Sequence, residues 1–275
     1  MNYKKAIGVF DSGYGGLTVL KEIHKLLPQY DFIYLGDNAR APYGPRSFET
    51  VYEFTLQSVK ELFDMGCPLV ILACNTASAK ALRNIQQKDL PQIDPNKRVL
   101  GVIRPTTEMV GKISKTKNVG VFGTQGTINS GSYPIEIHKF FPEIQVYQQA
   151  CPMLVPIIEN NEYQSEGADY FVKKYIDELN PAEKNIDTII LGCTHYPLLI
   201  STFKKYLPEN IELISQGEIV AQSLKEYFHR HPELESQISK NGTLSFFTTD
   251  DTESFDQKGS VFFGTTIQSK HIHLK

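Results

Sequence analysis

Residues 68–77, PLVILACNTA, and residues 188–195, TIILGCTH, decide the fold expected for this chain. Each stretch begins with large apolar residues that do not alternate with polar ones, which is typical of a strand buried on both faces of a parallel sheet. Each then passes through a cysteine, Cys74 or Cys193, into a segment of helical character. A buried strand that leads directly into a helix indicates an α/β fold.

The same alternation of short apolar runs and longer helical segments extends along the chain. Strands are expected at residues 6–10, 31–35, 68–73, 99–103, 119–122, 144–147, 188–191, 243–249 and 260–263. Helices are expected at residues 17–27, 47–65, 77–87, 105–115, 130–140, 152–160, 165–179, 197–206 and 218–229. The repeated strand–helix order predicts mainly parallel sheets.

Two internal similarities suggest that the chain contains two related units. IGVF at residues 7–10 resembles VGVF at residues 119–122, and the two cysteine-containing stretches match at nearly the same separation. Chance similarity between buried strands would explain either match alone. We therefore expect two similar α/β lobes, each a mainly parallel sheet flanked by helices, with an active site in the cleft between them. The first lobe is expected to comprise residues 1–98 with 217–275, its tail packing back, and the second residues 99–216.

Composition excludes several classes of protein. The chain has 275 residues with 28 basic and 31 acidic side chains, a net charge of −3, which provides no electrostatic footprint for nucleic acid or an anionic membrane. No apolar stretch is long enough to span a membrane, and the run at residues 6–10 is too short for a signal peptide. These features predict a soluble cytoplasmic protein. The four cysteines form no CxxC pair, which argues against a structural zinc site and predicts no metal.

Two glycine-containing loops could bind a ligand. Asp11 and Ser12 begin the loop DSGYGG, which lies between a strand and a helix and offers free backbone N–H groups to an anion. An ordinary strand–helix turn with Asp11 as a cap is the alternative. The loop at 36–45, GDNARAPYGP, follows the next strand and presents Tyr43 and Gly44. Its alternative is a rigid surface turn.

The two cysteines that follow buried strands are the strongest candidates for chemistry. A helix N-terminus stabilises a thiolate, so each could act as a base or nucleophile. A lone cysteine in such a place is usually a packing residue, but two in equivalent places of two similar units are not explained that way. His195 could be a proton donor, a substrate contact or a helix cap. Glu159 ends an apolar segment, where it could reach a site or face solvent. We expect Cys67 and Cys151 to be packing residues.

Taken in order, these motifs resemble those of the glutamate racemases. They are DSG.GGL (11–17), GD.AR.PYG (36–44), ACNTA (73–77), GT.GT (123–127), CP..VP..E (151–159) and GCTHYPLL (192–199), so the resemblance runs from about residue 7 to 200. The sequence departs from the family's pattern at residues 101–105, GVIRP, where many members have Glu-Pro in place of Arg104-Pro105. This departure lies at the expected lobe junction and leaves the cysteine motifs intact.

The resemblance implies an isomerase that interconverts L- and D-glutamate without a cofactor or metal and supplies D-glutamate for peptidoglycan. Cys74 would act on the D-enantiomer and Cys193 on the L-enantiomer, with Asp11 assisting Cys74, and Glu159 and His195 assisting on the other side. Substrate contacts would come from Asp11, Ser12, Tyr43, Gly44, Asn75, Thr76, Thr124, Thr127, Thr194 and His195. The family resemblance also suggests a homodimer.

Four alternatives compete with this interpretation. A two-lobed binding module would close on an amino acid without chemistry. An aspartate racemase would share the two-cysteine plan. A one-cysteine decarboxylase and a cysteine hydrolase would each leave the second thiol unexplained.

Overall fold

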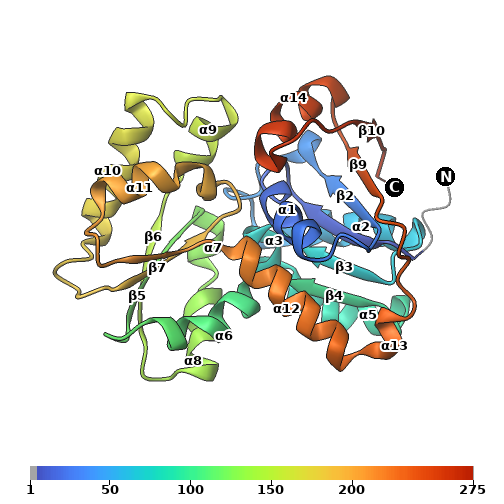
Figure 1. The fold of residues 1–275 in the computed structure, drawn as a ribbon, viewed down its shortest axis with the longest axis horizontal. Coiled ribbons are helices and arrows are strands. Elements are labelled where there is room, and N and C mark those ends of the chain that lie inside the picture. Colours follow the sequence, from blue (N-terminus) through green and yellow to red (C-terminus); the bar gives the residue numbers. More distant parts are fainter. Residues whose placement is uncertain (1–4, 275) are drawn as a thin grey trace.

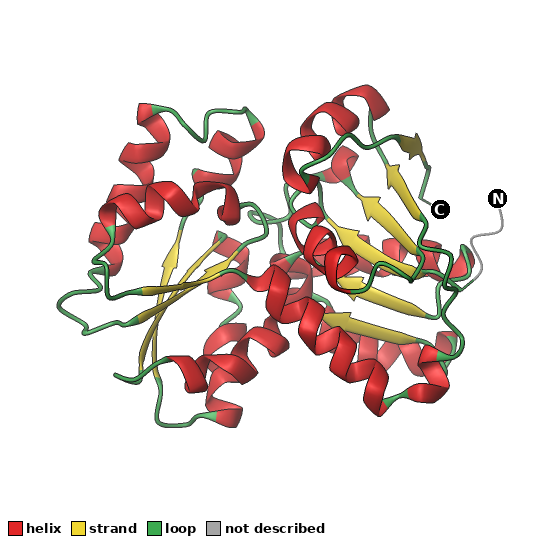
Figure 2. Cartoon of the chain, in the orientation of Figure 1, coloured by secondary structure: helices red, strands yellow, loops and turns green. Residues whose placement is uncertain are grey.

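The computed structural model describes residues 5–274 (Figure 1). The chain forms two lobes, each a parallel sheet with helices on both faces (Figure 2). This confirms the predicted two-lobed α/β fold. Residues 1–4, at the start of the predicted first lobe, and residue 275, at its end, lie outside the described residues.

The larger sheet has six strands in the order β10-β9-β2-β1-β3-β4, and all its pairs are parallel. Its strands are β1 (Ile7–Asp11), β2 (Phe32–Gly36), β3 (Leu69–Leu72), β4 (Arg98–Gly101), β9 (Leu244–Thr248) and β10 (Ser269–His271). The tail of the chain thus returns to this sheet, where β9 pairs with β2.

Both faces of the larger sheet are covered, which explains the unbroken apolar runs. Val9 and Ile71 belong to the core shared with α1 (Leu17–Leu26), α12 (Gln216–Arg230) and α14 (Thr252–Phe263). Phe10 and Leu72, one residue further along, belong to the core shared with α2 (Phe48–Asp64). Successive side chains of a strand point to opposite faces, which explains why residues 7–10 of β1 and 69–72 of β3 are all apolar or glycine.

The smaller sheet has four parallel strands in the order β6-β5-β7-β8. They are β5 (Asn118–Gly123), β6 (Gln145–Ala150), β7 (Thr188–Gly192) and β8 (Glu212–Ile214). The order β2-β1-β3-β4 in the larger sheet matches β6-β5-β7-β8 in the smaller one. The two internal sequence similarities therefore fall on corresponding strands, β1 with β5 and β3 with β7.

The helices of the first lobe cover the larger sheet. They are α1 (Leu17–Leu26), η1 (Asn38–Arg40), α2 (Phe48–Asp64), α3 (Asn75–Lys80), α4 (Leu82–Asn84), η2 (Ile85–Asp89), α5 (Leu90–Ile93), α12 (Gln216–Arg230), α13 (Pro232–Glu235) and α14 (Thr252–Phe263). The helix predicted at 77–87 therefore continues to Ile93. Pro91 follows the π-helical turn η2, near the end of this helix, and only two further helical residues come after it.

The helices of the second lobe cover the smaller sheet. They are α6 (Ile103–Ile113), α7 (Gln125–Asn129), α8 (Ser132–Phe140), α9 (Leu154–Glu159), α10 (Glu166–Leu179), η3 (Tyr196–Leu199) and α11 (Ile200–Tyr206). The side chain of Ser165 caps α10 by accepting from the Ala168 N–H. Helix α7 was not predicted, because the helix expected at residues 130–140 corresponds to α8 alone.

One predicted element is wrong. Residues 260–263, expected to form a strand, end helix α14. The Asp251 side chain caps this helix at the Ser254 N–H, and Phe255, Gly259 and Phe262 are buried at helical spacing. Asp251 and Glu253 therefore lie at the start of a helix, not between two strands.

The predicted lobe boundary after residue 98 cuts through β4. This strand pairs with β3 in the larger sheet, so the first crossing between the lobes follows Gly101. Ile103, which was assigned to the strand, already begins α6. The return crossing lies between β8 and α12, close to the predicted boundary at residue 217. The rest of the division into lobes stays a prediction.

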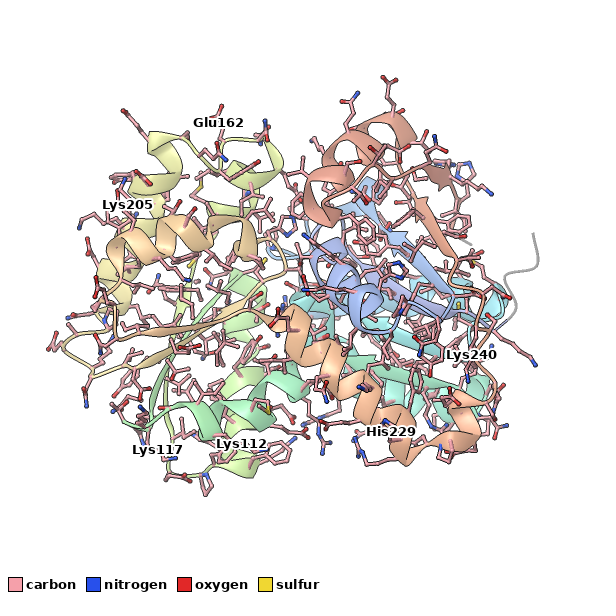
Figure 3. All side chains as sticks on the ribbon, viewed as in Figure 1. Lys112, Lys117, Glu162, Lys205, His229 and Lys240 are labelled. Atoms are coloured by element: carbon pink, nitrogen blue, oxygen red, sulfur yellow. The ribbon has the colours of Figure 1, made fainter. Side chains whose placement is uncertain are left out.

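Charged side chains lie around the outside of both lobes. Lys112, Lys205 and Lys240 are exposed and project from different parts of the surface (Figure 3). No helix within residues 5–274 is long and apolar enough to cross a membrane.

Candidate active site

The strand order of each sheet creates a crevice at the carboxyl ends of its central strands. In the larger sheet, the connections after β1 and β3 leave toward opposite faces, and ligands of open parallel sheets bind at such a point. Ser12 follows β1, and Cys74 follows β3. Thr124 and Cys193 occupy the corresponding places after β5 and β7 of the smaller sheet.

A cavity of about 170 Å³ is lined by residues of both lobes. Most of the predicted site residues line it, namely Ser12, Tyr43, Gly44, Cys74, Asn75, Thr76, Thr124, Glu159, Cys193, Thr194 and His195. Asp11 and Thr127 do not, but each hydrogen-bonds to a residue that does. Among the described residues that line the cavity there is no lysine or arginine, so hydroxyl, amide and thiol groups dominate its polar surface.

Cys74 is held as the N-cap of α3 and is almost completely buried. Its sulfur accepts a hydrogen bond from the Ala77 N–H at 3.4 Å and lies 3.5 Å from Ser12 Oγ. Burial and the carboxylate of Asp11 raise the pKa of the Cys74 thiol to about 12, although the helix terminus was expected to lower it. The Cys74 thiol is therefore protonated at neutral pH and suited to give a proton.

Cys193 has a histidine–glutamate pair beside it. Its sulfur lies 3.9 Å from His195 Nδ1, and His195 Nε2 hydrogen-bonds to Glu159 Oε1 at 2.9 Å. Burial acts to lower the pKa of His195, but the hydrogen bonds to Cys193 and Glu159 raise it to about 10. His195 therefore places a positively charged hydrogen-bond donor beside the Cys193 sulfur.

Asp11 belongs to the first lobe but contacts the second. Its carboxylate accepts hydrogen bonds from the Gly13 N–H at 2.8 Å and from Thr194 Oγ1 at 3.4 Å. Burial raises the pKa of the Asp11 carboxyl group, against the opposing charge of His195. Since these hydrogen bonds go to Gly13 and Thr194, the influence of Asp11 on Cys74 is electrostatic.

The DSGYGG loop approaches the second lobe so closely that only glycine fits at position 15. A Cβ atom at Gly15 would lie 2.2 Å from Thr194 Oγ1 and 2.4 Å from His195 Nδ1. Thr18 Oγ1, at the start of α1, also donates to the Thr194 carbonyl at 2.9 Å. The first loop thus holds the Cys193 loop in place.

Three threonine hydroxyls meet where the lobes adjoin. Thr76 Oγ1 lies 2.9 Å from Thr124 Oγ1 and 3.4 Å from Thr127 Oγ1, and Thr124 Oγ1 lies 3.1 Å from Thr127 Oγ1. Thr124 also caps α7 by accepting from the Thr127 N–H. The fully buried Thr127 therefore supports the two threonines that line the cavity.

Tyr43 lines the cavity, but its hydroxyl forms a hydrogen bond to Asp37, which does not line the cavity. The hydroxyl donates to the Asp37 carboxylate, which also pairs with Arg40 Nε at 2.7 Å. Burial and the charge of Asp37 raise the pKa of Tyr43 well above its usual value. Sequence reasoning included Asp37 in the motif at 36–44 but assigned it no role. The peptide bond between Ala41 and Pro42, on the same loop, is cis.

Several lining residues were not predicted as site residues. They are Ala41, Pro42, Pro45, Gln125, Cys151, Pro152, Val155 and Pro156. The motif CP..VP..E contains the last four, so the motif was the available signal, but its apolar members carry no chemistry that singles them out. Cys151 is buried, as expected of a packing residue, and also forms part of the cavity wall. Cys67 is buried within the first lobe.

Comparison with known proteins identifies the family. A family profile described as Asp/Glu/Hydantoin racemase matches residues 7–224. The chain belongs to this family. It is 39% identical to a protein named glutamate racemase from Persephonella marina, over 98% of this chain and 97% of that protein.

Solved structures of other family members have the same fold. The glutamate racemase isoform RacE1 from Bacillus anthracis superposes with a TM-score of 0.89 at 36% identity, covering 98% of each chain. A glutamate racemase from Francisella tularensis, solved in complex with D-glutamate, superposes with a TM-score of 0.88 at 35% identity, covering 99% of each chain. The chain is therefore an isomerase of the racemase class.

No group of three or more His, Cys, Asp or Glu side chains within residues 5–274 is placed to hold a metal ion.

Proposed function

We propose that this enzyme interconverts L- and D-glutamate with two thiols and no cofactor. The observation that carries the proposal is that Cys74 and Cys193 follow corresponding strands of the two lobes and line the same cavity. Racemisation requires a proton to leave the α-carbon on one face and to arrive on the other, and one group cannot easily serve both faces. The full-length similarity to proteins named glutamate racemase supports glutamate as the substrate.

In the L-to-D direction, the Cys193 thiolate takes the α-proton and the Cys74 thiol returns one to the opposite face. The α-carbon holds the electron pair between the two steps, and at the end Cys193 is a thiol and Cys74 a thiolate. Two observations support this starting arrangement: the positively charged imidazole of His195 lies beside Cys193, and burial raises the pKa of the Cys74 thiol to about 12. The D-to-L direction uses the inverse arrangement of protons.

Neutral groups would bind the substrate and stabilise the carbanion. Ser12, Asn75, Thr76, Thr124 and Thr194 place hydroxyl and amide groups along the cavity. Fixed dipoles of this kind stabilise developing negative charge without reorganising. Tyr43 and Gly44 would contribute through the aromatic ring and the backbone.

The test follows loss of the α-proton by NMR in D₂O, with L-glutamate, D-glutamate and L-aspartate in separate tubes. The wild-type enzyme is expected to exchange and invert both forms of glutamate without added pyridoxal phosphate. Exchange of aspartate in preference to glutamate would assign the other substrate. No exchange of either would indicate a binding module.

Cysteine variants test the two-thiol mechanism. Cys74→Ser and Cys193→Ser are each expected to lower the rate of racemisation by at least about 10³-fold, because a serine hydroxyl is a far poorer acid and base at neutral pH than a thiol. Cys67→Ser, at a buried thiol outside the cavity, is the control and should retain activity if it folds. Retained racemisation in either cavity variant would exclude the mechanism.

We also propose that the enzyme works in the cytoplasm as a homodimer and supplies D-glutamate for peptidoglycan. The family resemblance supports each part. Growth of a D-glutamate auxotroph carrying this chain would test the role, and light scattering of the purified protein would test the dimer.

A further inference from the structure

Gln216 is a buried glutamine at the return crossing between the lobes, and the predicted site does not include it. It is the first residue of α12, which begins between the two lobes (Figure 1). Its side chain is only 3% exposed. A buried amide needs partners for both of its polar ends, because an unsatisfied group is costly to bury.

The side chains of Gln216, Asn75 and Tyr133 form a closed ring of hydrogen bonds. Asn75 Nδ2 donates to Gln216 Oε1 at 2.6 Å, and Gln216 Nε2 lies within hydrogen-bond distance, 3.0 Å, of the Tyr133 hydroxyl. The Tyr133 hydroxyl then donates to Asn75 Oδ1 at 2.8 Å. Tyr133 comes from the second lobe and Asn75 from the first, next to Cys74.

A backbone carbonyl sets the direction of this ring. Gln216 Nε2 lies 3.1 Å from the carbonyl oxygen of Val102, which can only accept, so the Gln216 side chain must present its NH₂ group there. Its oxygen is then left to face Asn75, which must present its own NH₂ group. Asn75 Oδ1 consequently faces Tyr133. The hydroxyl of Thr106 donates to the same carbonyl and accepts from Gln216, which agrees with this direction.

Through Tyr133, this ring of hydrogen bonds also reaches the Cys193 loop. The ring of Tyr133 packs against Gly192, where a Cβ atom would lie 3.0 Å from Tyr133 Cε2. Gly192 directly precedes Cys193. Tyr133 therefore contacts the Cys193 loop with its ring and the residue after Cys74 with its hydroxyl.

We propose that Gln216 is a positioning residue, which holds the amide of Asn75 in the one orientation that serves the substrate. The proposal rests on the proposed function, in which Asn75 binds glutamate in the cavity. Without Gln216, the Asn75 amide loses the partner that distinguishes its nitrogen from its oxygen, and it can turn over. The Val102 carbonyl at one lobe crossing thus orients, through Gln216 at the other crossing, a group that contacts the substrate.

The experiment replaces Gln216 with methionine, which keeps the length of the side chain and removes both polar ends. The KM for glutamate is expected to rise about tenfold or more with a smaller change in kcat, since a substrate contact is weakened in the ground state and the transition state alike. Gln222→Met, at an exposed position of the same helix, is the matched control and should leave both constants unchanged. An unchanged KM in Gln216→Met would overturn the proposal.

A double variant separates positioning from a general structural effect. If Gln216 acts through Asn75, then Gln216→Met should lower kcat/KM in the wild-type background but not further in an Asn75→Ala background. Equal losses in both backgrounds would overturn the proposal. Tyr133→Phe breaks the ring of hydrogen bonds at a different point and keeps the aromatic side chain. Its loss of kcat/KM should likewise vanish in the Asn75→Ala background. This second variant tests the proposal even if Gln216→Met does not fold.

Failure of the proposed function has a different signature. If the wild-type enzyme and Gln222→Met both leave glutamate unchanged in D₂O, the assignment of the substrate is wrong. If both racemise glutamate and Gln216→Met does so with the same KM, only the role of Gln216 is wrong.

Discussion

The two lobes place their cysteines at corresponding positions but surround them with different groups. Cys74 has a hydroxyl beside it and a nearby carboxylate that disfavours its negative charge. Cys193 has a histidine whose pKa is raised to about 10 by its hydrogen bonds to Cys193 and Glu159. The duplicated strand order therefore supplies two symmetric places for a thiol, and the two lobes surround these places with different polar groups.

The largest test of this difference replaces the histidine. His195→Asn removes the positive charge next to Cys193, and kcat/KM is expected to fall by about 10²–10⁴-fold. The fall should be equal in both directions, because the equilibrium constant between enantiomers is one. Racemisation assays with each enantiomer measure it. His138→Asn, outside the cavity in the same lobe, is the control, and comparable losses in the two variants would contradict the assigned role.

The second test adds a single methyl group where a loop of the first lobe approaches the Cys193 loop of the second. Gly15→Ala would bring a Cβ atom within 2.4 Å of His195 Nδ1, so the Cys193 loop must move. Activity is expected to fall by about 10²-fold, since a misplacement of about 1 Å can have an effect of that size. Gly167→Ala, where the nearest atom lies at 3.4 Å, is the control. Full activity in Gly15→Ala would show that the approach of the two loops is not needed.

The smallest effect is expected where the lobes differ most in architecture, at the tail that only the larger sheet carries. Asp31 joins this tail to β2 by accepting hydrogen bonds from Asn241 Nδ2 at 2.6 Å and from the Thr243 N–H and hydroxyl at 2.8 Å. Burial acts to raise the pKa of Asp31, but hydrogen bonds from Ser239, Thr243 and Asn241 lower it to about 2. Asp31→Ala is expected to lower the free energy of unfolding by about 2 kcal/mol at neutral pH.

The pH dependence of this contribution has a definite sign. The pKa is lower in the folded protein than the usual 3.8, so the stabilisation is present above pH 3.8 and is lost as the pH falls through about 2. Urea unfolding of the wild type and of Asp31→Ala across this range measures it. Asp64→Ala, at an exposed carboxylate, should change stability by less than about 0.5 kcal/mol. A pH-independent difference between the wild type and Asp31→Ala would show that the charge of Asp31 does not hold the tail.

Much of the fold could be predicted because its strands are buried on both faces. The runs at 69–72 and 188–191 contain only apolar residues and one threonine, a pattern that hydrophobic periodicity detects directly. The segment at 260–263 was predicted wrongly because strand prediction relies on such short apolar runs. Its two phenylalanines fit a strand locally, and the helical spacing becomes visible only when Phe255 is included.

The sequence by itself determined the strand–helix order, the two equivalent cysteines and the resemblance to a racemase family, because each depends on residues close together in the chain. The tertiary structure decided the polar partners of the two thiols, the raised pKa of Cys74 and the orientation of Asn75. Asp11 and Thr194, His195 and Glu159, and Asn75 and Gln216 are far apart in sequence and meet only when the chain folds. Burial and these partners then shift the pKa values of Asp11 and His195, since the pKa of a group depends on the solvent and partners that the folded chain leaves it.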